Sequence, residues 1–346
     1  VPDSLPDASK IVWKKAMLHV EDVQTEDGRI SINGQWKVQI LYSDDTAEHQ
    51  IHRLEESIPF QESRAMDGNV GREHTQIGWE LEDLTVSLIN SRKVSIRGLI
   101  TFFFRMEESR ELQAAVELHG ISDVGVRKKE LELLELKVCK KDIYRLKESL
   151  TLPSSKPTIQ TILWSSMQLR GTEVRPENGK LSVRGECFLF LLYKSEEEQT
   201  KVQWMESALP FQGSLDCPGA EADLISQVDV QMEHYGITVE EDYDGEKRQI
   251  CAEAALGMQI HLYEEERTDI LTDVYSPVKE LVPVREDNRY ESLVMKKSLR
   301  IKASGKGKLT AVQPRMLQIC SSMGTVKMDD MRMTEKGLML EGAVLL

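Results

Sequence analysis

The sequence lacks most of the features that identify a function at first sight. Aromatic residues make up only 6% of its 346 residues, and no apolar run approaches the roughly 18 residues of a membrane-spanning helix. It contains five cysteines, at positions Cys139, Cys187, Cys217, Cys251 and Cys320. This odd set has no Cys-x-x-Cys pair, so neither a zinc ribbon nor a disulfide framework is indicated. We expect reduced, mostly buried thiols, which favour an intracellular compartment.

Basic residues are also in the minority, with 44 Lys and Arg against 58 Asp and Glu, a net charge of −14. That charge repels a phosphate backbone and makes nucleic acid an unlikely partner. A chain that is 40% hydrophobic and 29% charged can still bury cores, which excludes general disorder. The first ten residues have neither the basic start nor the apolar core of a secretory signal. The length suits two or three domains.

An internal repeat is the strongest signal in the sequence. Shifting the chain by 151 residues places residues 6–68 on residues 157–219 without a gap, with 17 identities over 63 positions, where about four are expected by chance. The identities include Trp13, Gly34, Tyr42, Pro59 and Phe60, which fall on Trp164, Gly185, Tyr193, Pro210 and Phe211. We take these ten residues as the structural signature of the repeat.

The repeat divides the chain into three parts. A further shift of 157 places Pro157 on Pro314 and Gly185 on Gly342. We therefore predict a first unit at residues 6–156 (repeat one), a second at 157–313 (repeat two) and an incomplete third copy at 314–346. Residues 94–102 match 250–258 at an offset of 156, so about five extra residues near 240–247 should lengthen a hairpin tip in repeat two.

Strand-like alternation dominates each unit. Apolar and polar residues alternate over 30–42, 81–89, 94–104, 131–138, 228–239 and 250–262. Asp27-Gly28 and Asn178-Gly179 read as hairpin turns, and the recurring Gly34 and Gly185 indicate a bulge or a close backbone approach. We predict an all-β fold of tandem antiparallel β-sandwich-like units with a few short helices, one of them just after Pro157 through Ile159, Ile162 and Leu163.

Two further positions carry structural predictions. Pro59 and Pro210 should end or flank strands, with Phe60 and Phe211 buried beside them. Phe188 and Phe190 replace the polar Lys37 and Gln39 of repeat one, so that strand is apolar on both faces. We regard Phe188 and Phe190 as a candidate interface, either with an adjoining unit or with another chain.

The candidate motifs for metal or phosphate binding do not match the known patterns. Residues 240–245 begin like a calcium loop, but Cys251 stands where a bidentate Glu is needed, so a solvated acidic loop is expected. Residues 304–308 lack the P-loop pattern and read as linker. His49 and His52 are not predicted to form a zinc pair, since residues three apart on a strand face opposite sides. We predict no catalytic residues, no cofactor and no metal.

The repeated unit resembles the SPOCS domain, a spore-coat-associated domain. The likeness is carried by Ile30-Ser31-Ile32-Asn33-Gly34 running to Ile40-Leu41-Tyr42, by Ile58-Pro59-Phe60, and by residues 84–103 with a hairpin at Asn90 and Ser91. Residues 181–193, Leu209-Pro210-Phe211 and 250–262 repeat it, and 152–169 resembles the family's connector.

The resemblance implies a non-enzymatic structural or adaptor protein of spore coat assembly on the mother-cell side of the developing spore. Its implied partners are other coat or coat-assembly proteins, or further copies of the chain. Peptidoglycan is not expected, because no LysM-like segment is found. The competing hypothesis is a tandem β-sandwich that binds a carbohydrate or a peptide, since a fold does not fix a function.

Overall fold

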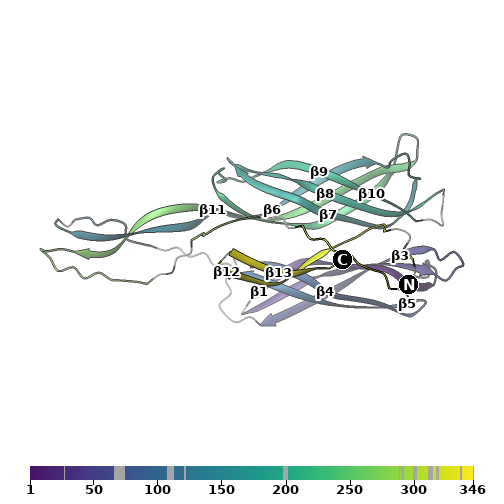
Figure 1. The fold of residues 1–346 in the computed structure, drawn as a ribbon, viewed down its shortest axis with the longest axis horizontal. Helices are drawn as coiled ribbons and strands as arrows, with labels where there is room; N and C mark the ends of the chain where they lie inside the picture. Colours follow the sequence, from purple (N-terminus) through teal and green to yellow (C-terminus); the bar gives the residue numbers. More distant parts are fainter. Residues whose placement is uncertain are drawn as a thin grey trace. The chain divides into compact units, whose positions relative to one another are not determined.

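The computed structural model describes residues 1–26, 28–65, 75–106, 113–120, 122–197, 202–287, 289, 292–298, 302–310, 315–316, 319–335 and 337–345. These residues form antiparallel strands and no helix, which confirms the all-β prediction (Figure 1). The strands are β1 (Ala8–Glu26), β2 (Arg29–Asp44), β3 (Ile51–Ala65), β4 (Thr75–Asn90), β5 (Lys93–Met106), β6 (Gly125–Thr151), β7 (Ile159–Glu177), β8 (Lys180–Ser195), β9 (Val202–Asp216), β10 (Ile225–Glu241), β11 (Lys247–Tyr275), β12 (Thr325–Thr334) and β13 (Gly337–Leu345). The chain divides into two compact units, 1–294 and 295–346.

Repeat one contributes two sheets, β1-β2-β3 and β4-β5. Alternate residues of β2 point inward, and Val38, Ile40 and Tyr42 are almost fully buried. Side chains of β4 and β5, including Val86 and Ile96, pack against them. The period-2 pattern thus gives each sheet one apolar face, and the two faces close on one core.

Repeat two has the same first sheet, β7-β8-β9, and a larger second sheet, β10-β11-β6. Its core is more extensive and includes Leu189, Leu191, Ile250, Leu256 and Ile260, all fully buried. The extra residues of repeat two form the turn between β10 and β11, where Asp242 Oδ1 accepts the backbone N–H groups of Asp244 and Glu246, each at 3.0 Å. The lengthened hairpin tip is therefore confirmed, and its acidic side chain caps a turn.

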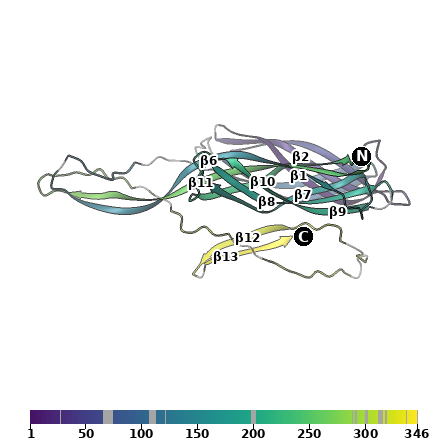
Figure 2. The same cartoon turned by 90° about the horizontal axis from the view of Figure 1, so that it is seen from above.

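The third strand of this second sheet comes from the preceding part of the chain. β6 follows β5 in the sequence and lies inside the predicted first unit, yet it pairs with β11 from Thr151↔Gln249 to Gly125↔Tyr275. Its second half, 138–151, completes the core of repeat two. Its first half, with residues 264–275 of β11, continues beyond the end of β10 as a two-stranded arm (Figures 1 and 2).

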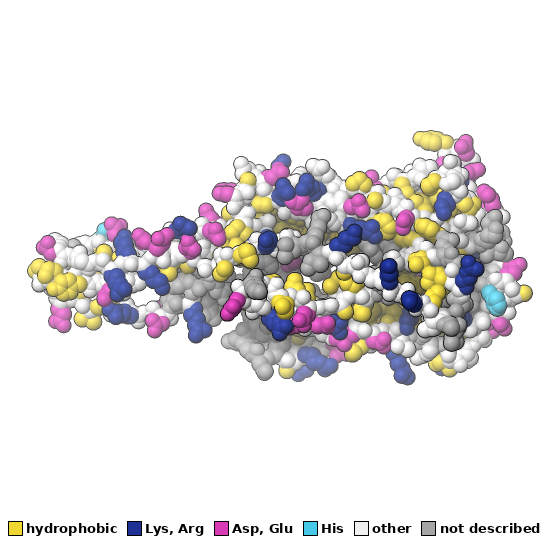
Figure 3. Space-filling view, in the orientation of Figure 1, with side chains coloured by type: hydrophobic (Ala, Val, Ile, Leu, Met, Phe, Trp, Pro, Cys, Tyr) yellow, Lys and Arg dark blue, Asp and Glu magenta, His cyan; other side chains and the backbone are white. Residues whose placement is uncertain are grey.

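Opposite charges line this arm. Lys137 pairs with Glu264 and Arg267 with Glu132, each at 2.8 Å. Figure 3 shows acidic and basic side chains interspersed along it, in keeping with a solvated two-stranded ribbon whose cross-strand pairs carry opposite signs.

The segment predicted to be an incomplete third copy contains the hairpin β12-β13, in the second unit. A register shift lies between Met328 and Asp330, opposite Gly342. The same shift occurs opposite Gly34 in β1 and opposite Gly185 in β7. The glycine therefore marks a bulge on the neighbouring strand in repeat one, in repeat two and in this hairpin, as the sequence indicated.

The helix predicted after Pro157 is wrong. Residues from Ile159 onward form β7, and register shifts lie between Ile159 and Thr161 and between Ile162 and Trp164. Each bulge adds a residue to the strand, so apolar residues three or four apart reach the same face and imitate a helical period.

The placement of the two prolines at strand ends is also wrong. Pro59 lies in the middle of β3 and Pro210 in the middle of β9. Both strands are edges of their sheets, where a residue without an N–H can face outward at no cost to the ladder. Phe211 is buried as predicted, whereas Phe60 is only half-buried.

Candidate functional site

The repeat signature forms the frame of each first sheet. Tyr42 and Tyr193 are almost fully buried, and their hydroxyls donate to equivalent carbonyls, Pro6 O at 3.0 Å and Pro157 O at 3.1 Å. Each tyrosine thus fastens the segment that enters its repeat to the central strand.

The glycines and phenylalanines of the signature are cross-strand partners. Phe60 pairs with Gly34 and Phe211 with Gly185. A Cβ built on Gly185 would lie 2.8 Å from Phe211 Cζ, and one on Gly34 would lie 2.8 Å from the Phe60 ring and would overlap His19 O. The ring therefore occupies the space above the glycine, which explains why the two residues recur together.

Aromatic residues connect repeat one to repeat two. The rings of Trp13 and Trp164 are 5.3 Å apart, Trp164 and Phe190 are 5.2 Å apart, and Phe190 and Trp204 are 6.3 Å apart. Phe190 is only 2% exposed. We call Trp13, Trp164, Phe190 and Trp204 the aromatic row. The candidate interface residue Phe190 is thus buried in its own chain, in a row of rings that reaches repeat one through Trp164 and Trp13.

Phe188, the other candidate interface residue, lies elsewhere. It is half-buried, and the Arg170 guanidinium lies over its ring at 3.5 Å from the centroid. A cation–π contact of this kind covers the ring within repeat two.

Two polar contacts involve β7 and β8, the strands that carry Trp164 and Phe190. Lys194 Nζ donates to Gln50 Oε1 at 3.2 Å across the two repeats. Tyr235 donates to Ser165 O at 3.2 Å, and burial raises the pKa of this tyrosine to about 12. At the end of β2, Asp44 accepts Thr46 Oγ1 at 2.6 Å and His52 Nε2 at 2.9 Å. Burial alone would raise the pKa of Asp44, but these bonds and the backbone N–H groups of Thr46 and Gln50 hold it at about 2.

Two arginines were missed by the sequence reasoning. Arg92 donates to the carbonyls of Leu5 and Pro2 and to the carboxylate of Asp7, and its counterpart Arg248 donates to the carbonyls of Pro153 and Lys156. Both clamp the segment that enters a repeat. The offset of 156 places one on the other, so the repeat alignment was a signal that could have found them.

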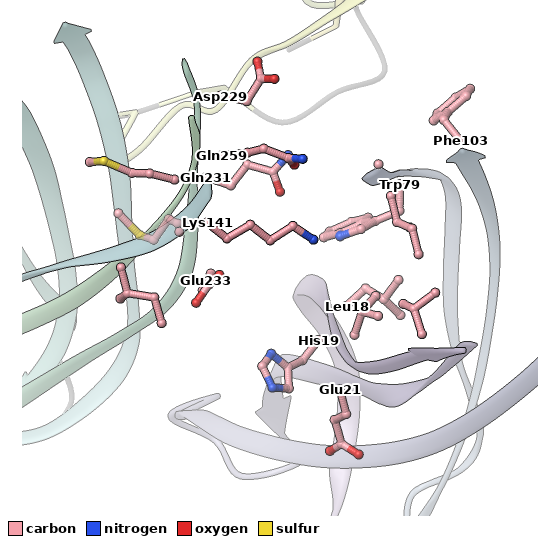
Figure 4. A pocket seen from close by; sticks show the side chains of 18 of the residues that line it. Leu18, His19, Glu21, Trp79, Phe103, Lys141, Asp229, Gln231, Glu233 and Gln259 are labelled. Carbon is pink, nitrogen blue, oxygen red and sulfur yellow. The ribbon is translucent and has the colours of Figure 1, made fainter. Parts of the chain in front are cut away.

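A cleft of about 1200 Å³ lies within the first unit between strands of the two repeats. Trp79 of β4 and Phe103 of β5 stand on one side, and Lys141, Gln231 and Gln259 of the β10-β11-β6 sheet stand opposite (Figure 4). In Figure 4 the Lys141 side chain extends toward the Trp79 indole. Glu233 lies over Gly257, where an added Cβ would overlap the Glu233 carboxylate. Aromatic faces opposite amides and carboxylates can stack on and hydrogen-bond to a polar ligand.

The remaining sequence candidates lie apart from this cleft. His52 is held by Asp44, and among the described residues no three His, Cys, Asp or Glu side chains converge as a metal site. No disulfide joins the five cysteines, all of which lie among the described residues: Cys187 and Cys217 are buried, Cys139 and Cys251 half-buried, and Cys320 exposed. Burial raises the pKa of Cys187 to about 11, which disfavours the reactive thiolate. Within the described chain, no helix is long and apolar enough to cross a membrane.

Paired antiparallel sheets that recur with the same tyrosine, glycine and proline–phenylalanine positions define a tandem β-repeat protein. The family model described as SipL, SPOCS domain, matches this chain twice, at residues 7–89 and 158–240. The chain is a tandem SPOCS-domain protein. No curated protein and no solved structure matched it.

Proposed function

We propose that this chain is a non-enzymatic structural or adaptor protein of spore coat assembly, acting on the mother-cell side of the developing spore. The observation that supports this best is the double match to the SPOCS domain, whose family name implies a coat-related role. Its partners would be other coat or coat-assembly proteins.

The architecture suits such a role. Strand β6 ties the end of repeat one into the sheet of repeat two, and the aromatic row joins the repeats again through Trp13 and Trp164. Two connections of this kind keep a pair of binding surfaces at a fixed spacing, which is what an adaptor needs.

The test is the position of a fluorescent fusion during sporulation. We expect the fusion to gather around the developing spore, and Leu189→Asp, which places a charge in the repeat-two core, to abolish that localisation. The matched control is Tyr243→Ala at a fully exposed loop tip, which should localise normally. A wild-type fusion that stays diffuse throughout sporulation would refute the proposal.

The cleft favours a second candidate function, the binding of a carbohydrate or a peptide. Trp79 is 38% exposed and Phe103 is 53% exposed, which is unusual for large aromatic side chains facing polar ones. Titration calorimetry with soluble glycans and peptides tests it. Trp79→Ala should abolish any binding detected, whereas Leu338→Ala, in the third copy, should not.

A further inference from the structure

The second sheet of repeat one ends at β5, whereas the matching sheet of repeat two extends past the matching strand. β11 is hydrogen-bonded to β10 on one side and to β6 on the other. β5 corresponds to β11 at an offset of 156, and among the described residues it pairs only with β4. Over residues 93–103, the other edge of β5 therefore presents N–H and C=O groups to which a further strand can bind.

Apolar side chains at this edge are open to water. Leu99 is 57% exposed and Phe103 is 53% exposed. Val94 is only partly buried, whereas its counterpart Ile250 is fully buried and lies opposite Leu150 of β6. A strand added beside β5 would cover these side chains in the same way.

The residues of this edge alternate between the two faces of the sheet. Val94 and Ile96 pack against the core of repeat one. A Cβ on Gly98 would overlap the Trp36 ring of the same core, so the even-numbered positions face inward. The odd-numbered positions face outward, in the order Lys93, Ser95, Arg97, Leu99, Thr101 and Phe103. This outward row has a hydroxyl between two cationic side chains in its first half and a hydroxyl between two apolar side chains in its second half.

We propose that the β5 edges of two copies of this chain pair antiparallel about a two-fold axis at Gly98, which joins their β4-β5 sheets into one. The outward row then pairs with its own reverse: Lys93 lies opposite Phe103 of the second copy, Ser95 opposite Thr101 and Arg97 opposite Leu99. On the inward face, Val94 lies opposite Phe102 and Ile96 opposite Ile100. Such an interface uses the same surface on both chains, so it closes at a dimer. The inference goes beyond the spore-coat role and does not depend on it.

Side-chain chemistry selects this register. The lysine stem can cover the exposed Phe103 ring, with its ammonium group near the ring face. The stem of Arg97 covers Leu99 in the same manner, and no two like charges lie opposite each other. An axis at Arg97 would place the two arginines opposite each other, and an axis at Leu99 would place Phe103 opposite Ser95. Of these three axes, the one at Gly98 alone puts both exposed apolar residues opposite long side chains.

Cross-linking of the outward row tests the partner and the register together. Two full-length chains with the exposed Cys320 replaced by serine, one carrying Ser95→Cys and the other Thr101→Cys, are mixed and oxidised. Opposite residues of antiparallel strands have Cα atoms about 4.5 to 5.5 Å apart, which a disulfide can span. We expect a disulfide-linked dimer that contains one chain of each kind.

Ser87→Cys is the matched control for Ser95→Cys. Ser87 is exposed and lies directly opposite Ser95 on β4, one strand farther from the second copy. Mixed with the Thr101→Cys chain, it should give no such dimer above background. Absence of the dimer with Ser95→Cys would overturn the proposal, and so would an equal yield with Ser87→Cys.

Sedimentation velocity of the full-length chain provides a second measurement, without added cysteines. We expect concentration-dependent association that ends at a dimer. Leu99→Lys places a like charge opposite Arg97 and should weaken the association about tenfold or more, whereas Leu99→Glu should not weaken it. Ile89→Lys, at a similarly exposed position on β4, is the control and should associate like the wild type. A wild-type chain that is monomeric at every concentration, or equal weakening by Leu99→Lys and Ile89→Lys, would also refute the pairing.

Discussion

At the scale of single residues, the repeat signature reflects pairs rather than isolated positions. Gly185 is paired with Phe211 across two strands, and Tyr193 with the carbonyl of Pro157. The sequence indicated a close approach at the glycine and burial of Phe211, but not that the ring itself approaches the glycine. Cross-strand register, which the pattern of one strand does not contain, decides this.

The contact between Gly185 and Phe211 predicts a coupled loss of stability. Gly185→Ala should lower the free energy of unfolding by about 1 to 3 kcal/mol, because the added Cβ would lie 2.8 Å from the ring. Phe211→Ala should cost about 3 to 5 kcal/mol. The double variant should lose less than the sum, as the smaller side chain makes room for the methyl group.

Urea denaturation of the four proteins measures this coupling. Gly236→Ala, in the strand β10, is the matched control because its Cβ would meet nothing within 4 Å. We expect its effect to be within about 0.5 kcal/mol of zero. Strict additivity of Gly185→Ala and Phe211→Ala would show that the ring and the glycine do not interact.

The hydrogen bonds of Asp44 predict that the folded protein loses stability in acid. Its folded pKa of about 2 lies below the ordinary 3.8, so its contribution to stability is complete above about pH 4 and is lost as the pH falls toward 2. The contribution is about 2 kcal/mol. Asp44→Asn should be less stable at pH 7 and should lose less stability than the wild type between pH 5 and pH 2.

Unfolding measured across that pH range checks the Asp44 prediction. Asp45→Asn at the exposed neighbouring position is the control and should follow the wild type. If the Asp44→Asn chain lost as much stability on acidification as the wild type, another group would be responsible.

At the scale of elements, alternation in the sequence located most strands but not their partners. The stretches predicted at 94–104 and 250–262 lie in β5 and β11. The prediction of a helix after Pro157 was wrong because two bulges in β7 change the spacing of its apolar residues. The pairing of β6 with β11 of repeat two could not be predicted, because a half-buried strand has the same apolar–polar pattern whichever sheet edge it joins. The cleft was missed for the same reason, since it is lined by strands distant in sequence.

Because β6 pairs with β11, a substitution in β6 should destabilise repeat two rather than repeat one. Leu146→Pro should remove a ladder hydrogen bond and a buried side chain next to Ala254 of β11. Hydrogen exchange should then accelerate in β10 and β11 and remain nearly unchanged in β1 and β2. Lys129→Pro, in the arm, is the control and should affect only the arm. Faster exchange confined to β1–β5 would mean that β6 supports repeat one instead.

At the scale of the whole molecule, the structural repeat begins earlier in the chain than the sequence repeat does. The alignment begins each unit at Pro6 and Pro157, but the sheets of repeat two are complete only with β6, which precedes Pro157. The buried positions that β6 supplies are part of the same core as Leu256 and Ile260. A fragment that folds independently should therefore begin before the sequence repeat does.

Two fragments test this phase difference. Residues 125–294 contain β6 with every strand of repeat two, and we expect them to unfold cooperatively in urea. Residues 157–294 lack β6, so the outer edge of β11 and the side chains facing Leu146 would be open to water. Since a removed strand exposes both a hydrogen-bonding edge and apolar area, this shorter fragment should aggregate or show a much lower denaturation midpoint. Adding a peptide of residues 138–151 should restore part of the lost stability, and a peptide with Leu146→Asp should not. Equal midpoints for the two fragments would show that β6 is an accessory strand and that repeat two is already complete at Pro157.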